Sequence, residues 1–318
     1  MRKALCVGIN YYEYFNSLES CITDASRMGK TLSHDENDDP NFEVKYLYAT
    51  SKNLTVTRRE LKDHISELFS GDPDIALFYF SGHGSIDSCG GYLCTSEITD
   101  PDEGLSLNDL MKIVRDSKAR NKVIILDSCH SGQVASPTAM SNFSELPENT
   151  VILAACQNDE SAYEGVFTPL LIDALKGGAM NLLGEVTPGS VYSHLDRSLG
   201  AWEQRPVFKA NIKNFVCLRK NIAPISKAEL RKLIVHFDTP DMLYQLDPTY
   251  EEDKRDIPGG EKNPEHEAIF KLFRKYASLN LLVPVGAPHM YQAAVNSKQC
   301  ELTPLGRYYW KLVKKNKI

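Results

Sequence analysis

The sequence predicts an α/β fold with a mostly parallel sheet flanked by helices over residues 1–220, and a smaller helix-rich domain over residues 221–318. Up to about residue 220, short apolar runs alternate with amphipathic stretches. These runs lack the strict polar–apolar alternation of half-exposed strands, so both faces of each strand are expected to be buried. Strands that alternate with helices favour parallel pairing, with helices on both faces of the sheet.

The strands predicted for the first domain are short runs rich in Val, Ile, Leu and aromatic residues: Ala4–Ile9, Val44–Tyr48, Ile75–Phe80, Lys122–Leu126 and Val151–Ala155. Stretches with apolar residues at helical spacing lie between them. They predict the helices Ser20–Leu32, Thr57–Phe69, Ser106–Asp116, Thr168–Leu175 and Ser190–Leu199.

The second domain carries mainly helix signals. Ser226–Glu229 has the pattern of a capping box, which predicts the start of a helix. Glu265–Leu279 has apolar residues at helical spacing, and Thr303 followed by Pro304 predicts the cap and first turn of a closing helix. A short β element is predicted from Leu281–Val285 and Gln299–Leu302.

Composition favours a cytoplasmic protein with no membrane association. The net charge of -6 gives no general attraction to nucleic acid or to anionic membranes. The first residues, MRKALCVGIN, contain only a short apolar run without a cleavage site, and they indicate a strand rather than a signal peptide. The 8 cysteines lack the regular spacing of a secreted disulfide scaffold. Those in apolar runs are expected to be buried free thiols: Cys6, Cys156 and Cys217.

Residues suited to nucleophilic catalysis follow two of the predicted strands. His83 comes after Ile75–Phe80, and Cys129 comes after Lys122–Leu126, each in a turn rich in Gly and Ser. Ligands bind outside the carboxyl ends of parallel strands, so both residues would face one cleft if these strands are neighbours. A thiol with a pKa of about 8.5 becomes a strong nucleophile when an imidazole takes its proton. The sequence therefore predicts Cys129 as nucleophile and His83 as general base.

The residues around this pair complete the predicted site. The backbone N–H groups of Gly84 and Cys129 are candidates for stabilising a tetrahedral oxyanion. His130 is adjacent to the nucleophile but is expected to point elsewhere. A lone His or Cys at a strand end is more often structural, whereas two such residues at equivalent strand ends favour catalysis.

These motifs resemble those of the caspase clan, in its metacaspase and bacterial caspase-homologue branch. Cys129 follows His83 by 46 positions, close to the separation of about 50 known for caspases. The caspase-specific pentapeptide is absent. The resemblance covers about residues 1–220 and implies a caspase-haemoglobinase fold. Four segments carry it besides Ser81–Gly84: Lys3–Tyr11, Cys21–Ala25, Asp127–Gly132 and Ala155–Glu160.

The resemblance also implies a substrate class, protein chains with Arg or Lys before the scissile bond. Asp24 and Asp127 match the two acidic positions of the family's primary pocket, and carboxylates there would pair with a basic side chain. A pocket for Asp would need basic residues, and no Arg accompanies these motifs. The family further implies a signal-activated effector of a stress, defence or cell-death pathway.

No cofactor is expected to be required. Some members of the family depend on calcium, and Asp100, Asp102 and Glu103 are the acidic candidates for such a site. Their spacing differs from that of an EF-hand, which favours a solvated loop. Cys89 and Cys94 have a loose spacing for zinc, and no second ligand pair follows them.

Two alternatives come from other classes of protein. One is a catalytically idle scaffold with a caspase fold, against which the intact pair of His83 and Cys129 argues. The other is a regulator that binds nucleic acid through its C-terminal domain, since Glu301–Trp310 resembles the closing helix of winged-helix domains. Residues 222–318 hold 15 Lys and Arg against 12 Asp and Glu, a weaker basic excess than DNA readers show. We therefore expect this domain to bind a regulatory protein partner rather than nucleic acid.

Overall fold

The computed structural model describes residues 1–87, 90–129, 146–155, 165–200, 205–251 and 263–318. It divides into two compact units, Met1–Ile222 and Ala223–Ile318. In the described residues, no helix combines the length and the apolar character that crossing a membrane requires.

The first unit is built on a mostly parallel sheet, as predicted. Its strand order is β2-β1-β3-β6-β7-β9. The five strands β2, β1, β3, β6 and β7 are parallel, and β9 runs antiparallel to β7. Short β4 pairs with β3, and β5 pairs with β4. The bounds are β1 Arg2–Ile9, β2 Glu43–Ala49, β3 Ile75–Asp87, β4 Gly90–Leu93, β5 Leu105–Ser106, β6 Asn121–Cys129, β7 Thr150–Ala154 and β9 Val207–Asn211. A separate pair joins β8 Glu185–Val186 to β10 Arg219–Lys220.

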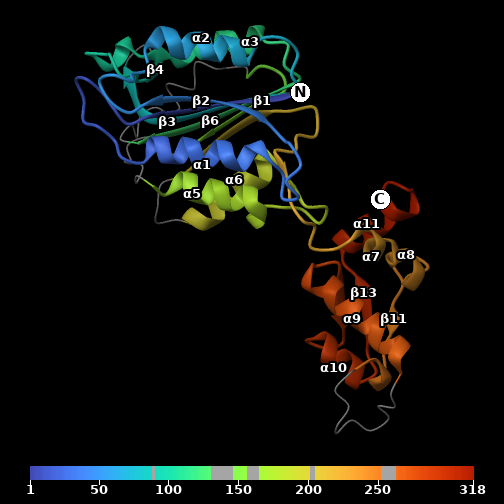
Figure 1. Cartoon of the computed structure of the whole chain (residues 1–318). Coiled ribbons are helices and arrows are strands. Elements are labelled where there is room, and N and C mark those ends of the chain that lie inside the picture. Colours follow the sequence, from blue (N-terminus) through green and yellow to red (C-terminus); the bar gives the residue numbers. More distant parts are fainter. Residues whose placement is uncertain (88–89, 130–145, 156–164, 201–204, 252–262) are drawn as a thin grey trace. The chain divides into compact units, whose positions relative to one another are not determined.

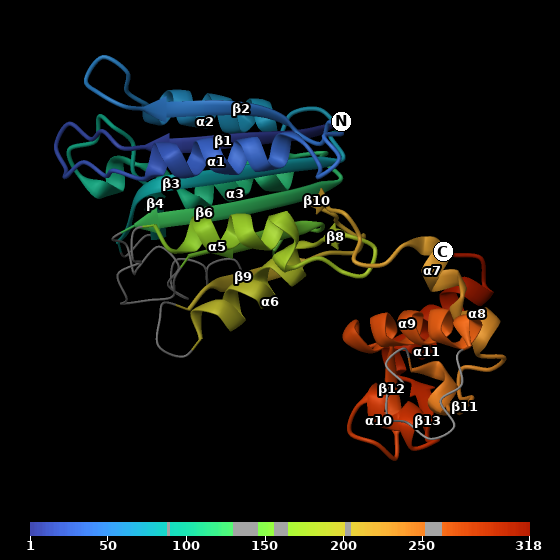
Figure 2. The same ribbon diagram turned by 60° about the horizontal axis from the view of Figure 1, so that its bottom comes forward.

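Helices cover both faces of this sheet. Figure 1 shows α2 and α3 on one face and α1, α5 and α6 on the other, and Figure 2 shows the same layers turned. The bounds are α1 Cys21–Ser33, α2 Arg58–Leu68, α3 Leu107–Asp116, α5 Phe167–Asp173 and α6 Pro188–Leu199. Alternate residues of β1 enter opposite cores, Leu5 and Val7 on the α2–α3 side and Ala4 and Cys6 on the α1–α5 side. The strands therefore need no polar face, which explains their near-continuous apolar runs.

Local capping sets the helix starts close to the predicted positions. Thr57 and Glu60 form a capping box before α2, and Ser106 caps α3. The predicted helix Thr168–Leu175 instead ends at Asp173. A wider turn over Ala174–Gly178 follows it, where Gly177 has a φ of 119° that side chains disfavour.

The two strands that carry the predicted site are longer than their apolar runs. β3 continues to Asp87 and β6 continues to Cys129, so His83 and Cys129 lie within paired strands rather than in loops. The ladder between β3 and β6 extends through these positions, and β4 pairs with the far end of β3. Polar and small residues gave this extension the appearance of a turn in the sequence.

The second unit contains helices around a small antiparallel sheet of order β11-β13-β12. The expected capping box of Ser226 and Glu229 is present, and Thr303 caps the last helix with Pro304 in its first turn. β12 and β13 pair as predicted, but α10 lies between them in the chain. The likeness to a winged helix stays a prediction. The bounds are α7 Lys227–Arg231, α8 Leu233–His236, β11 Tyr244–Gln245, α9 Pro264–Ser278, β12 Leu282–Val285, α10 Met290–Val295, β13 Gln299–Leu302 and α11 Pro304–Lys314.

Candidate active site

The backbone brings the two predicted catalytic residues together. β3 and β6 are neighbouring parallel strands whose register pairs His83 with Cys129. Paired strands lie about 4.8 Å apart, so the two side chains start from adjacent backbone positions at the carboxyl end of the sheet. The Cys129 side chain and His130 lie outside the described part of the structure.

The loop between β1 and α1 fixes the His83 ring. Nε2 of His83 lies 2.8 Å from the carbonyl oxygen of Asn16. A carbonyl oxygen only accepts hydrogen bonds, so Nε2 carries the proton of the neutral imidazole and Nδ1 keeps its lone pair. This tautomer gives His83 a basic nitrogen, which a general base requires.

Tyr12 of the same loop holds the backbone of His83. The N–H of His83 donates to the Tyr12 hydroxyl at 2.7 Å, and the two ring centroids lie 4.6 Å apart. Tyr12 is 3% exposed. A Cβ at Gly82 would lie 2.6 Å from this hydroxyl, so the contact requires glycine there. Neither Tyr12 nor Asn16 stands in a sequence pattern that marks a site residue.

Gly84, the first candidate for the oxyanion site, lies in β3 opposite Leu93 of β4. The neighbouring carbonyl of His83 accepts a hydrogen bond from the N–H of Cys94 at 3.0 Å. β4 therefore anchors the strand beside the candidate base. The oxyanion role of Gly84 and Cys129 stays a prediction.

The two predicted pocket carboxylates are both buried, Asp24 on α1 and Asp127 on β6. Oδ2 of Asp127 accepts a hydrogen bond from the Thr168 hydroxyl at 2.5 Å, and Thr168 in turn lies 2.6 Å from the Tyr79 hydroxyl. Burial raises the pKa of the Tyr79 phenol well above its usual value, and the charges of Asp127 and Asp24 raise it further. Since both carboxylates act on one phenol, the structure brings them into one buried neighbourhood.

The acidic residues considered for calcium take part in a turn. The Glu103 carboxylate accepts hydrogen bonds from the backbone N–H groups of Thr99 at 2.7 Å and Asp100 at 3.2 Å. These bonds, with that from the Thr99 hydroxyl, lower the pKa of Glu103. Over the described ranges, no group of three or more His, Cys, Asp or Glu side chains is arranged to hold a metal ion.

The described cysteines have free thiols. Cys6 is buried as expected, whereas Cys217 is only half-buried, because in this segment its neighbours Val216 and Leu218 are the residues that enter the core. Burial raises the pKa of the Cys94 thiol to about 11, which keeps it protonated. Its candidate zinc partner Cys89 lies outside the described residues, as does Cys156.

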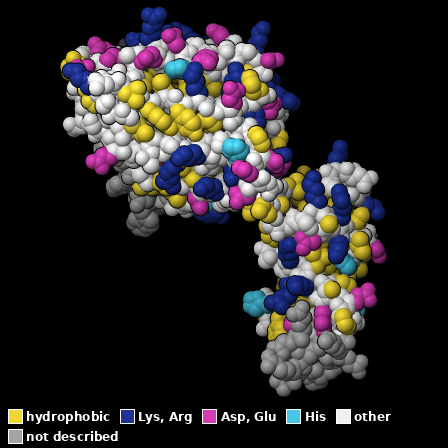
Figure 3. All heavy atoms as spheres, viewed as in Figure 1, with side chains coloured by type: hydrophobic (Ala, Val, Ile, Leu, Met, Phe, Trp, Pro, Cys, Tyr) yellow, Lys and Arg dark blue, Asp and Glu magenta, His cyan; other side chains and the backbone are white. Residues whose placement is uncertain are grey.

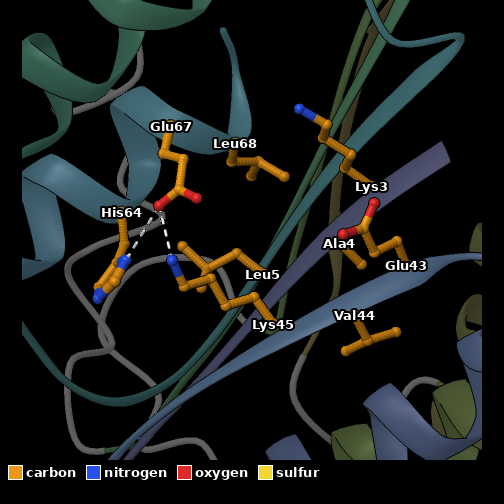
Figure 4. A pocket seen from close by; sticks show the side chains of 9 residues that line it. All are labelled: Lys3, Ala4, Leu5, Glu43, Val44, Lys45, His64, Glu67 and Leu68. Carbon is orange, nitrogen blue, oxygen red and sulfur yellow. Dashed lines mark hydrogen bonds and ion pairs between the residues drawn. The ribbon is translucent and has the colours of Figure 1, made fainter. Parts of the chain in front are cut away.

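A pocket of about 360 Å³ lies elsewhere in the first unit. Figure 4 shows that it is formed by the starts of β1 and β2 and by one side of α2. The ammonium of Lys45 lies 2.6 Å from the Glu67 carboxylate, and His64 Nδ1 lies 3.6 Å from it. Because β1, β3 and β6 are parallel, this pocket is at the amino ends of the strands and contains none of the predicted site residues.

Comparisons with known proteins agree with this architecture. The family model described as "Caspase domain" matches residues 1–216. Metacaspase-9 of Arabidopsis thaliana is 30% identical over 173 residues, which cover 47% of this chain and 51% of that protein. Metacaspase-1 of Schizosaccharomyces pombe is 32% identical over 147 residues, which cover 41% of this chain and 34% of that protein. The chain thus matches about half or less of the length of these relatives.

A solved structure shows the same fold. The crystal structure of Caspase-1 from Spodoptera frugiperda has a TM-score of 0.50 and 12% identity, covering 70% of this chain and 90% of that one. This likeness and the observed sheet confirm the predicted caspase fold. Because the family model matches well over half of the 318 residues, this chain belongs to the caspase-domain family.

Proposed function

We propose that the protein is a cysteine endopeptidase in which Cys129 is the nucleophile and His83 the general base. The observation that carries this proposal is the register that pairs His83 with Cys129 across β3 and β6. The Asn16 carbonyl supports it, because it sets the tautomer in which Nδ1 of His83 accepts a proton. The metacaspase relatives support the same chemistry.

The reaction proceeds through a covalent intermediate. Nδ1 of His83 takes the proton of the Cys129 thiol, and the thiolate attacks the carbonyl carbon of the scissile peptide bond. The N–H groups of Gly84 and Cys129 stabilise the oxyanion that forms. The protonated His83 then gives its proton to the leaving amine, and a thioester remains on Cys129. A water molecule, deprotonated by His83, attacks the thioester carbonyl. The C–S bond then breaks, the acid product leaves, and the Cys129 thiolate takes a proton back from His83.

The substrate is cleaved after Arg or Lys. Asp24 and Asp127 support this specificity, because both carboxylates are buried and act on the same Tyr79 phenol. Two negative charges in one buried neighbourhood favour a cationic side chain, with which they form charge-assisted hydrogen bonds.

The second unit, Ala223–Ile318, binds a regulatory protein partner that controls the peptidase, as fits an effector of a stress, defence or cell-death pathway in the cytoplasm. On the face shown in Figure 3, its Lys and Arg side chains are interspersed with acidic and apolar ones. A mixed surface of this kind supports a protein partner over nucleic acid, which calls for a concentrated basic face.

A panel of fluorogenic peptides that vary only the residue before the scissile bond tests the proposal. We expect the full chain to cleave after Arg and Lys and to reject Asp. Cys217→Ala, which removes a half-buried thiol in the same unit, is the matched control and should retain full activity. Hydrolysis by a folded Cys129→Ala protein would contradict the mechanism. A wild-type protein that cleaves none of the peptides would favour the idle scaffold.

A further inference from the structure

We propose that Tyr79 and Thr168 are positioning residues that hold the Asp127 carboxylate in one orientation for the basic side chain of the substrate. The inference rests on the proposed function and deepens it, because it names side chains outside the predicted pocket pair that set how the pocket binds its cation.

A hydrogen-bond chain links three elements of the first unit. Tyr79 comes from β3, Thr168 from the first turn of α5, and Asp127 from β6. The hydroxyl oxygens of Tyr79 and Thr168 lie 2.6 Å apart, and that of Thr168 lies 2.5 Å from Oδ2 of Asp127. Figures 1 and 2 show α5 beside α1, the helix that carries Asp24, and the two helices are in contact.

The chemistry of the groups fixes the direction of this chain. An ionised carboxylate only accepts hydrogen bonds, so Thr168 uses its single hydrogen on Asp127. The Tyr79 hydroxyl must then donate to the oxygen of Thr168. The pKa of Tyr79, raised first by burial and then by the charge of Asp127, keeps the phenol protonated for this role. The Tyr79 hydroxyl therefore donates to the Thr168 oxygen, and the Thr168 hydroxyl donates to the Asp127 carboxylate.

Burial makes the chain rigid. Tyr79 and Thr168 have no exposed surface, and Asp127 is 6% exposed. Water cannot readily replace a missing donor at such a site, so the carboxylate depends on Thr168 for that contact. A carboxylate with one oxygen held at 2.5 Å presents a fixed plane to an incoming ligand.

A fixed plane matters more for Arg than for Lys. The guanidinium is a flat fork that binds a carboxylate through two parallel hydrogen bonds, which requires alignment of the two planes. The Lys ammonium is a point charge with three rotatable donors and tolerates a tilted carboxylate. Loss of the chain should therefore reduce cleavage after Arg more than cleavage after Lys.

Four variants of the full chain test this inference. Thr168→Val removes the hydroxyl at nearly constant volume, Thr168→Ser keeps it, and Tyr79→Phe removes only the first donor. Tyr276→Phe is the matched control, because the Tyr276 hydroxyl is also buried but donates to the Glu229 carbonyl at 2.5 Å in the second unit. Each protein is assayed with paired Arg and Lys peptides. The rate at which iodoacetamide alkylates Cys129 is measured in parallel, because that small reagent does not use the pocket.

For Thr168→Val we expect kcat/KM on the Arg peptide to fall by about tenfold, mainly through KM, with a smaller fall on the Lys peptide. Tyr79→Phe should also lower kcat/KM on the Arg and Lys peptides, but by less than Thr168→Val does. Thr168→Ser and Tyr276→Phe should match the wild type, and alkylation of Cys129 should be unchanged in all four.

Other results would overturn the inference. Equal activity of wild type and Thr168→Val on the Arg peptide would show that the chain does not position Asp127. Equal losses for Thr168→Ser and Thr168→Val would assign the effect to packing, and a parallel loss of alkylation would assign it to the fold. If Thr168→Val does not fold, Tyr79→Phe replaces it in the same assays. Wild-type activity of Tyr79→Phe on the Arg peptide would then refute the inference. If the wild type cleaves neither the Arg nor the Lys peptide, the proposed function itself is wrong. If the wild type is active and the Thr168→Val and Tyr79→Phe proteins cleave as fast as it does, only this inference is wrong.

Discussion

Each end of the first unit's sheet carries a histidine with polar neighbours. The two ends differ in how deeply those neighbours are buried. At the amino ends, Lys45 and Glu67 meet at 2.6 Å with His64 nearby, but their side chains are 48% and 61% exposed. At the carboxyl ends, Tyr12 beside His83 and Thr168 beside Asp127 are almost fully buried. Exposed ion pairs contribute little because water screens them, whereas buried polar contacts fix geometry. A cluster of charged residues therefore becomes a site only where packing holds it.

The largest expected difference concerns the two histidines. His83→Ala should lower kcat/KM on an Arg peptide by about 10⁴-fold, because the thiol of Cys129 loses its base. His64→Ala, at the amino-end pocket, should leave it unchanged. Kinetics on both proteins, with circular dichroism to verify folding, measure this. Equal activity of His83→Ala and His64→Ala would show that His83 is not the base.

The acidic residues provide the next comparison. Asp127→Asn keeps the shape and the acceptor for Thr168 but removes a buried charge, so cleavage after Arg should fall by about 10²-fold. Glu67→Gln, at the exposed pair, should change it by less than about twofold. Steady-state assays on one Arg peptide compare them. Should Asp127→Asn retain the wild-type rate and selectivity, the acidic pocket would be wrong while the catalytic pair could stand.

Tyr12 offers an intermediate effect. Tyr12→Phe leaves the partly buried N–H of His83 without this acceptor, which loosens the backbone that positions the ring. We expect kcat to fall by about tenfold, with KM little changed and slower alkylation of Cys129 by iodoacetamide. Tyr14→Phe is the control, since Tyr14 lies in the same loop and is 59% exposed. Matching behaviour of the two variants would contradict a positioning role for Tyr12.

The smallest effect concerns stability at the amino-end pocket. Lys45→Met breaks the exposed pair with Glu67, so the midpoint of chemical unfolding should stay close to that of the wild type. Chemical denaturation at two salt concentrations measures this. A clear fall in that midpoint would show that this pair is part of the packed structure.

Much of the fold followed from the sequence, because apolar runs and caps are local signals. The strand cores, the capping boxes at Thr57 and Ser226 and the closing helix at Thr303 lie where local pattern predicts. The sequence does not predict the ends of β3 and β6, because most of their last residues are small or polar. Only the pairing of β3 with β6 and with β4 shows that these residues are extended.

The candidate site divides in the same way. His83 and Cys129 were predicted from their places after two strands, whereas Asp24 and Asp127 were predicted from the family resemblance. Thr168 acts on Asp127 from 41 positions away and on Tyr79 from 89 positions away, separations that leave no local pattern. Asn16 contributes a backbone carbonyl, which any residue type supplies. The sequence therefore predicts the candidate reactive groups, whereas the side chains and carbonyl that contact them are visible only in the fold.

Covalent labelling is the sharpest test of Cys129 as the nucleophile and His83 as its base. A peptidyl chloromethyl ketone ending in Arg is incubated with the full chain, and the modified residue is identified by mass spectrometry. We expect one adduct, on Cys129, formed slowly in His83→Ala and in Asp127→Asn and at the wild-type rate in His64→Ala. An adduct on another cysteine such as Cys94, or labelling of Cys129 that is independent of His83, would contradict it.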